Sequence, residues 1–261
     1  MPGEFTRFLI GDRATPVPQN DLHQNIALSQ SKPRIMTPIG IEFNAGEFSP
    51  VVSWELRDAN GKLVDRAAKK ADSFLANFIK ILHCQMSNDT FFHLRKSVSA
   101  VRAKLLIRDT SGVYFIPRAC SNNLNAAATI GDATLGLIVG TDNTPTAFDD
   151  YVLGALIAHG VGAGQLQYGV TSYGLPTSDG TTSQFRFTRI MSNGSGAAIN
   201  VNEAGIVGYC LRGYNELFGA VTYGITQSLK ILLLRDILPG APVAVPNGNS
   251  LTVNYQPQAT V

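Results

Sequence analysis

The side chains best able to do chemistry in the middle of this chain are the oxygen donors of Asp142, Asn143, Asp149 and Asp150. A Ca²⁺ ion takes about six to eight oxygen ligands, which carboxylate and amide groups can supply. The spacing matches no Asp-x-Asp-x-Asp-Gly loop with a closing Glu, and Asp and Asn serve equally well in turns and caps. We therefore predict turns rather than a metal site, with a hard-cation site as the alternative.

A zinc site is the second candidate, on His83, Cys84 and His93. Zinc fingers and ribbons use paired His or Cys ligands, and no second pair stands at such a spacing here. His83 and Cys84 are also adjacent on an expected helix, so their side chains point apart. Cys84 is better interpreted as a small core residue.

The stretch Gly160-Val-Gly-Ala-Gly164 invites comparison with dinucleotide-binding loops. That fingerprint has the form Gly-x-Gly-x-x-Gly and lies between a strand and a helix. Its last position is occupied by Gln165, and the residues that follow are typical of a strand. We interpret the stretch as a flexible loop and predict no cofactor.

Hydrolytic chemistry would centre on His159, the histidine of this Gly-rich region. A nucleophile elbow has the pattern Gly-x-Ser-x-Gly after a buried strand. Gly194-Ser195-Gly196 lacks that spacing and follows no such strand. We predict no catalytic residue, and hence no enzyme.

Nucleic acid would be bound by the basic residues Arg95, Lys96, Arg102 and Lys104. Such surfaces combine concentrated positive charge with aromatic side chains, but here no aromatic residues alternate with the basic ones. The net charge of the chain is only +2. The sequence therefore predicts no nucleic-acid partner.

The elements that would position any site are clearest in the last third of the chain. Residues 185–191 alternate between two faces, as in a half-buried strand. The connectors 192–196 and 246–250 each contain an Asn-Gly pair typical of tight turns, and Pro239 and Pro242 end an apolar run. This pattern predicts a mainly β fold, an antiparallel sandwich or barrel, with strands at 185–190, 204–211, 231–238 and 250–255.

Upstream, residues 51–57 and 62–65 predict a hairpin around Asn60-Gly61, with Trp54 as a core anchor. One amphipathic helix is predicted over 73–87, capped by Asp72 or Ser73, with Lys80 facing away from the sheet. Its expected apolar stripe consists of Phe74, Leu75, Phe78, Ile79, Leu82 and Met86.

A second hairpin is expected from residues 98–107 and 112–117, turned by Asp109-Thr-Ser-Gly112. In the Gly-, Asn- and Thr-rich region that follows, short strands are expected at 135–139, 151–158 and 166–170. No internal repeat of fixed length is evident.

The composition is low in charge. The chain has 261 residues, of which 44% are apolar and 15% charged, against about 25% charged in ordinary soluble domains. Since a lone monomer keeps a charged surface for solubility, we expect much of this surface to meet other protein, with a weakly charged monomer as the alternative.

The charges are also unevenly distributed, with net values of +5 over residues 1–118, −5 over 119–185 and +2 over 186–261. Opposed patches of this kind can pair between neighbouring copies, although they need not be contiguous in the fold.

Cysteines and targeting signals point to synthesis in a reducing compartment. Cys84, Cys120 and Cys210 are too few and too scattered for a disulfide framework. The first residues contain no apolar core of a signal peptide, and no apolar run reaches about 18 residues, so we expect no membrane partner.

Residues 1–38 are predicted to form an extended N-terminal arm, followed by a β-rich domain over 39–261 in which a division near 120 or 184 stays open. Proline breaks the arm repeatedly, which favours extended conformations that lie along a surface. Its apolar tip consists of Phe5, Phe8, Leu9 and Ile10, which we predict to form an assembly interface with another copy or partner.

Two segments carry a resemblance. Residues 149–168 contain Asp-Tyr-x-Leu and Ile-Ala-His-Gly-x-Gly-x-Gly-Gln-Leu, and residues 232–255 contain Leu-Arg-Asp and Pro-x-x-Val-x-Val-Pro-x-Gly-x-x-Leu-Thr-Val-x-Tyr. They resemble uncharacterised virion structural proteins of tailed bacteriophages, over roughly residues 135–256, with a weaker echo at 73–86. The motifs mark turns and strands, so the resemblance implies no catalytic residue. It implies a place in the virion, in head, neck, tail or fibre base.

The sequence thus predicts a non-enzymatic virion structural protein, made in the host cytoplasm, whose partners are copies of itself and other virion proteins. The alternative is a receptor- or glycan-binding module of the tail-fibre type. Such a module needs exposed aromatic side chains in turn-rich loops, for which Tyr114, Tyr168, Tyr173 and Tyr214 are available.

Overall fold

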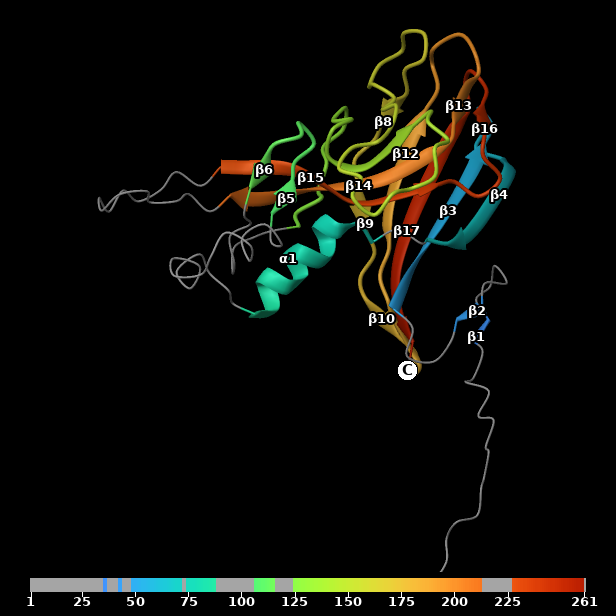
Figure 1. The fold of residues 1–261 in the computed structure, drawn as a ribbon. Helices are drawn as coiled ribbons and strands as arrows, with labels where there is room; N and C mark the ends of the chain where they lie inside the picture. Colours follow the sequence, from blue (N-terminus) through green and yellow to red (C-terminus); the bar gives the residue numbers. More distant parts are fainter. Residues whose placement is uncertain are drawn as a thin grey trace, which may run out of the picture. The chain divides into compact units, whose positions relative to one another are not determined.

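The computed structural model describes residues 35–36, 42–43, 48–71, 74–87, 106–115, 124–212 and 227–260. The chain divides into two units, residues 1–32 and residues 33–261, and all of the described residues belong to the second. Every strand pair in this unit is antiparallel, as Figure 1 shows, and the prediction of a mainly β, antiparallel fold is confirmed.

The largest sheet is built around β17 (Ser250–Thr260). On one side β17 pairs with β3 along its whole length, from Ser250 opposite Arg57 to Ala259 opposite Phe48, and β3 pairs in turn with β4. On its other side it pairs with β12 and then β11. The other strands of this sheet are β3 (Phe48–Arg57), β4 (Leu63–Lys70), β8 (Gln167–Tyr168), β9 (Ser172–Tyr173), β10 (Thr177–Ser178), β11 (Thr182–Gln184) and β12 (Phe187–Ser192).

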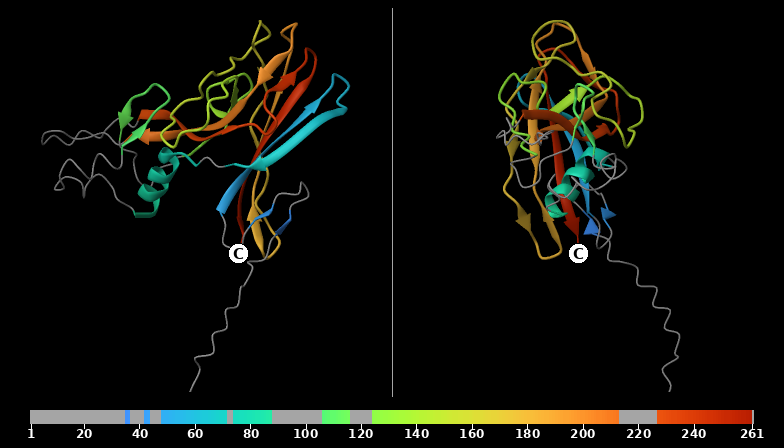
Figure 2. Two further views of the ribbon diagram at one scale, coloured as in Figure 1. Left: turned by 45° about the vertical axis from the view of Figure 1, so that its right-hand side comes forward. Right: turned by 60° about the vertical axis from the view of Figure 1, so that its left-hand side comes forward.

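A second sheet has the order β15–β14–β7, and Figure 2 shows β14 and β15 as long neighbouring strands. Their register shifts between Ile206 and Val207, where a β-bulge interrupts the ladder. The strands are β7 (Gly136–Gly140), β14 (Glu203–Arg212) and β15 (Gln227–Ile237). Three small two-stranded sheets complete the described strands: β1 (Ile35–Met36) with β2 (Glu42–Phe43), β5 (Ile107–Arg108) with β6 (Tyr114–Phe115), and β13 (Ile199–Val201) with β16 (Val243–Val245).

The predicted turns at Asn60-Gly61 and at 109–112 are both confirmed, and in each an aspartate side chain accepts hydrogen bonds from the backbone of the turn. In the β3–β4 hairpin, the Oδ1 atom of Asp58 accepts hydrogen bonds from the backbone N–H groups of Asn60 and Lys62, both at 2.9 Å. In the β5–β6 hairpin, Asp109 does the same for the residues that follow it. A positive φ falls on glycine in each turn, where it costs little.

The core lies between the two larger sheets, and polar side chains cross it. Alternate residues of β3 and β17 point toward the second sheet, and Trp54 is buried among them, as predicted. The Nε1–H of Trp54 donates to the Pro239 carbonyl at 2.8 Å.

Tyr255 Oη lies 2.9 Å from Asp236 Oδ2 and 3.1 Å from the Ala204 carbonyl, so one hydroxyl of β17 contacts both β14 and β15. Burial, reinforced by the nearby Asp236 carboxylate, raises the pKa of Tyr255.

The predicted helix is confirmed as α1 (Ala76–Ser87), which packs against β15 (Figure 1). Over residues 74–83 the buried positions are Leu75, Ala76, Asn77 and Ile81. Ile79 and Leu82 are exposed. The predicted stripe is therefore wrong at those two residues, because the buried face is turned by about one residue and includes a polar side chain. The Nδ2 of Asn77 donates to the Arg108 carbonyl at 2.9 Å, which satisfies it inside the fold.

Lys80 of α1 is bound to the segment that leads into β5. The interpretation that Lys80 faces away is wrong, because its Nζ donates to the Leu106 carbonyl at 2.7 Å. The capping candidates Asp72 and Ser73 lie outside the described residues. Within the part of the chain that the structure describes, no helix is long and apolar enough to cross a membrane.

The strand predicted at 151–158 is wrong. This segment makes only an isolated bridge at Leu156, opposite Gly140. Its backbone N–H groups at Gly154 and Ala155 donate to the carboxylate of Glu203 instead of to a neighbouring strand. The strand expected at 166–170 is shorter than predicted and reduces to β8, whereas 135–139 is confirmed as β7.

Candidate functional site

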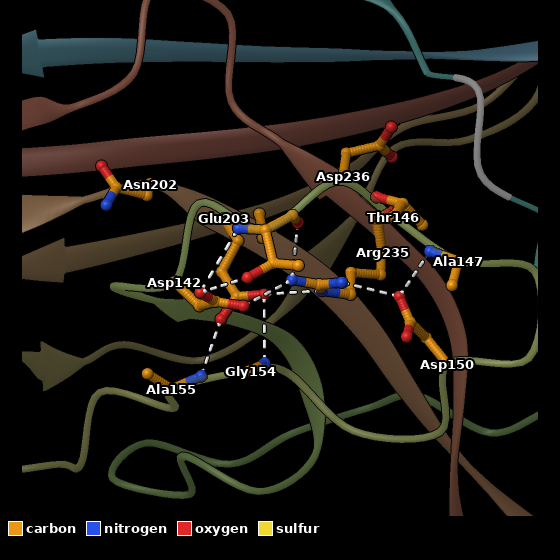
Figure 3. Close-up of polar contacts among 12 residues, drawn as sticks. Asp142, Thr146, Ala147, Asp150, Gly154, Ala155, Asn202, Glu203, Arg235 and Asp236 are labelled. Atoms are coloured by element: carbon orange, nitrogen blue, oxygen red, sulfur yellow. Dashed lines mark hydrogen bonds and ion pairs between the residues drawn. The ribbon is translucent and has the colours of Figure 1, made fainter.

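The most polar buried cluster surrounds Arg235 of β15, shown in Figure 3. Its Nε–H donates to Glu203 Oε2 at 2.7 Å, and its terminal nitrogens donate to Asp150 Oδ2 at 2.6 Å and to Asp142 Oδ2 at 3.0 Å. One of these nitrogens also donates to the Thr144 carbonyl at 3.1 Å. A single guanidinium thus holds three carboxylates from β14 and from the 141–155 segment.

Glu203 is the central carboxylate of this cluster because it is fully buried and accepts from both sides. Besides Arg235, it accepts hydrogen bonds from the backbone N–H of Ala155 at 3.0 Å and of Gly154 at 3.3 Å. A buried carboxylate is tolerated only when its lone pairs are satisfied in this way. Glu203 therefore attaches the irregular 141–155 segment to the beginning of β14, the central strand of the second sheet.

Glycine is required at two positions beside these carboxylates. A Cβ atom at Gly154 would lie 1.9 Å from Asp142 Oδ2, and one at Gly140 would lie 2.3 Å from Glu203 Oε1. Real Cβ atoms do not approach oxygen so closely. The two glycines make the space in which the carboxylates reach Arg235.

The electrostatics follow from these contacts. Burial lowers the pKa of a guanidinium, but hydrogen bonds to Glu203 and Asp150 outweigh it and raise the pKa of Arg235. The hydroxyl and backbone N–H of Thr144, together with Arg235, hold the pKa of Asp142 below its usual value despite partial desolvation. Arg235 and Asp142 are therefore both charged at neutral pH and paired with each other.

This arrangement answers the hard-cation alternative. Asp142 and Asp150, two of the oxygen donors that the sequence singled out, do converge on a cation, but the cation is the side chain of Arg235. No group of three His, Cys, Asp or Glu in the described part of the chain is arranged to hold a metal ion. The sequence signal for the partner was Arg235-Asp236 inside an otherwise apolar strand, which the sequence analysis did not connect to the carboxylates.

A second buried guanidinium, that of Arg189 on β12, has a different environment. All of its N–H groups donate to backbone carbonyls, at 2.7 to 3.1 Å. The five acceptors are the carbonyl oxygens of Thr129, Asp132, Leu135, Leu137 and Gly169. Its guanidinium carbon lies 4.8 Å from the centre of the Tyr168 ring, and burial lowers the pKa of Arg189. Arg189 therefore joins β12 to β7 and to the 129–135 loop.

The glycine loop and His159, considered above for cofactor binding and hydrolysis, make structural hydrogen bonds. Gln165 closes the glycine loop: its Oε1 accepts from the Gly162 N–H at 3.0 Å and would lie 2.2 Å from a Cβ at Gly160. His159 Nδ1 accepts from the Tyr168 N–H at 3.0 Å. His83 is exposed on α1, whereas the side chain of Cys84 and all of His93 lie outside the description.

The tyrosines named for glycan binding divide among three environments. Tyr168 is buried, and its hydroxyl lies 2.8 Å from the Ile157 carbonyl, so it is not available on the surface. Tyr114 is exposed beside Arg108, and Tyr173 is exposed beside Phe187. Tyr214 lies outside the described residues.

Several other predicted residues also lie outside the described ranges, including the basic cluster at Arg95, Lys96, Arg102 and Lys104. The predicted assembly residues Phe5, Phe8, Leu9 and Ile10 lie outside them as well.

The acidic middle segment is largely paired within the chain. Asp142 and Asp150 contact Arg235, and Asp132 lies 3.9 Å from Lys230 Nζ. The −5 and +2 segments therefore meet inside one fold, which leaves less of that charge for contacts between copies.

The described surface contains one cluster of aromatic rings, which we call the aromatic surface. It comes from two groups of rings. Phe48 stacks on Phe74, and Phe74 on Phe78, with centroids 5.2 and 4.6 Å apart. Tyr173 contacts Phe187 edge-on and Phe185 contacts it at a tilt, both with centroids 5.1 Å apart. Three of its members are substantially exposed: Phe48 at 56%, Tyr173 at 44% and Phe185 at 37%.

The fold and its buried clusters define a mainly antiparallel β protein whose ionisable side chains hold its loops to its sheets. Comparison with protein-family models, with curated proteins and with solved structures gave no match.

Proposed function

We propose that this chain is a non-enzymatic structural subunit of a tailed-bacteriophage particle, which assembles with copies of itself and with other proteins of the particle. The phage setting is supported by the resemblance of residues 135–256 described above. The structural role is supported by the exposed aromatic surface on a chain with only 15% charged residues.

The observation that carries the proposal is the contrast between the interior and the surface. The two most polar buried clusters, around Arg235 and Arg189, have their donors satisfied by the fold itself. Three aromatic side chains, those of Phe48, Tyr173 and Phe185, are by contrast exposed on one face of a sheet. Contiguous exposed apolar area of this kind marks a surface for protein contact.

A tail-fibre module that binds glycans is the competing proposal. Sugar sites place aromatic rings beside hydrogen-bonding groups on one face. The polar residues that alternate with the aromatic ones, Arg186 and Gln256, lie on the opposite face of the sheet, where their side chains hydrogen-bond to each other. This favours a protein partner over a sugar.

The test is the state of the purified chain, measured by native mass spectrometry and by negative-stain electron microscopy. The proposal predicts defined oligomers, rings, tubes or shells at micromolar protein. A chain that stays monomeric and captures no other protein from particle extracts would contradict it. A glycan array without signal would remove the competing proposal.

A further inference from the structure

The aromatic surface belongs to the face of the large sheet that also carries the core. Phe187 lies directly opposite both Tyr173 and Tyr255, and Tyr255 lies opposite Val52. Directly opposed residues share a face of the sheet, and so do alternate residues of one strand. Phe48, four residues before Val52 on β3, therefore lies on the same face. Tyr255 and Val52 are fully buried, whereas Phe48 and Tyr173 at the end of the same face are not.

The chemistry of this end is apolar. Along β3 and β17, the residues that alternate toward this face beside Phe48 are Pro50, Pro257 and Ala259. At this end of the face a charged residue, Lys69, lies at the margin, opposite Val52 on β4. An occupant of this surface should therefore present apolar side chains rather than charges or hydroxyls.

The free edge of the large sheet is a weaker candidate for contact. Among the described strands, β4 pairs only with β3, so its outer edge is open to another strand. Four of its eight residues are charged: Asp65, Arg66, Lys69 and Lys70. Charged side chains on an edge strand oppose pairing with another chain. The aromatic surface has no such protection.

One segment of the chain has matching chemistry. Phe5, Phe8, Leu9 and Ile10 lie within six consecutive residues, and residues 11–34 separate them from β1. A connection of that length reaches about 80 Å when fully extended, which is enough to leave one domain and reach the next. A buried aromatic side chain removes roughly 150–250 Å² from water, so Phe5 and Phe8 could cover a large part of the aromatic surface.

We propose that the aromatic surface is the docking site for the N-terminal segment 5–10 of a second copy of this chain. This inference rests on the proposed self-assembly and names the surface that carries it. The segment lies across Phe48, Phe185 and Tyr173 and continues both groups of rings. Each copy both gives an arm and receives one, so reciprocal exchange closes a two-fold dimer, whereas head-to-tail exchange builds a ring or a filament.

Photo-cross-linking tests the proposal directly. A chain with p-benzoylphenylalanine in place of Phe8 is mixed with a ¹⁵N-labelled chain of ordinary sequence, allowed to assemble and irradiated. Mass spectrometry then separates links within a chain from links between chains. The proposal predicts links from position 8 to ¹⁵N-labelled peptides that contain residues 48–52, 173–187 or 255–259.

Surface variants provide the second arm of the experiment. Phe48→Ser and Phe185→Ser should each weaken self-association by about tenfold or more, the usual effect of removing an aromatic anchor. The matched control is Ile190→Ser, because Ile190 is 50% exposed on the opposite face of β12. That control should leave self-association unchanged, and circular dichroism checks that all three variants fold.

Each outcome decides a different point. Links confined to the same chain mean that the arm covers its own domain, which overturns the inference. Links to other peptides of the second copy, or equal effects of Ile190→Ser and Phe48→Ser, overturn the docking site while the proposed self-assembly stands. A protein that never forms oligomers overturns the proposed function and this inference with it.

Discussion

Arg235 Nε lies 2.7 Å from Glu203 Oε2, and both side chains are almost wholly removed from solvent, with 4% and 0% of their surface exposed. The pair joins adjacent strands β14 and β15, and through Glu203 it also holds the backbone of residues 154 and 155. A buried pair with this many hydrogen bonds costs little while it is complete and much when one partner is lost.

The first prediction concerns that pair. Glu203→Ala leaves the Gly154 and Ala155 N–H groups without their acceptor and removes one of three carboxylates from Arg235. The free energy of unfolding should fall by about 3 kcal/mol or more. Urea denaturation measures it. The control is Glu55→Ala, since Glu55 pairs with Arg57 at the surface and should cost about 1 kcal/mol or less. Equal losses would show that burial of the pair is unimportant.

The second prediction is a dependence on pH. The folded-state pKa of Asp142 lies below its usual 3.8, so its ionised form stabilises the fold above that value. As the pH falls below about 4, the unfolded chain binds the proton first, and the contribution is lost as the pH passes the folded-state pKa. The urea midpoint should fall steeply in this range, and less steeply in Asp142→Asn. A midpoint that is constant down to about pH 3 would contradict this account.

The third prediction concerns Arg189, whose N–H groups donate to five backbone carbonyls. A lysine has fewer donors on one nitrogen and cannot reach all five. Arg189→Lys should therefore destabilise the fold by about 2 kcal/mol or more, since each buried carbonyl left without a donor costs roughly 1–3 kcal/mol. Arg186→Lys is the control, because Arg186 contacts only Gln256 at the surface. It should change the unfolding free energy by less than about 0.5 kcal/mol.

The fourth prediction tests the space around the carboxylates. Gly154→Ala places a methyl group where Asp142 Oδ2 now lies, and should lower stability by about 1–3 kcal/mol through overpacking. Gly174→Ala is matched to it, since neither glycine has a positive φ and a Cβ at Gly174 meets its neighbours at 3.7 to 3.8 Å. Thermal unfolding should separate the two variants. If both behave alike, the tight packing at Gly154 is not real.

The fifth prediction concerns the arm. Deletion of residues 1–20 removes Phe5, Phe8, Leu9 and Ile10 but none of the described residues. Ordering such a segment costs roughly 1–2 kcal/mol per residue, which contacts with another copy would offset. The melting temperature of the isolated subunit should stay nearly unchanged while oligomers weaken. A lower melting temperature with intact assembly would place the arm in the core of its own chain.

Much of the fold was accessible from the sequence because local patterns determine it. Alternation predicted the strand at β12, apolar runs between turn residues predicted β14, β15 and β17, and Asn60-Gly61 predicted the β3–β4 hairpin. The segment 151–158 shows the limit of that reasoning. Its apolar run has the composition of a strand, but the N–H groups of Gly154 and Ala155 bond to Glu203, about 50 residues away, which no local pattern reveals.

The buried clusters were accessible only in part. Asp142 and Asp150 were predicted to form turns, with a shared cation only as the alternative, and the cation on which they converge is an arginine from a distant strand. Arg189 stands at an inward position of an alternating strand, between Phe187 and Met191. Hydrophobic patterning alone cannot predict a buried guanidinium at this position. The buried charge is tolerated only because the fold brings backbone carbonyl groups from several segments around it.

The position of β17 has a consequence for the order of events during synthesis. Its partners β3 and β12 precede it by about 200 and 60 residues, and neither is paired with the other. A nascent chain that has emerged only as far as residue 245 therefore carries two halves of the large sheet with no strand to join them. Long-range pairing of this kind folds slowly and leaves strand edges open meanwhile. Within the cell, newly made chains are thus most prone to aggregate just before β17 leaves the ribosome.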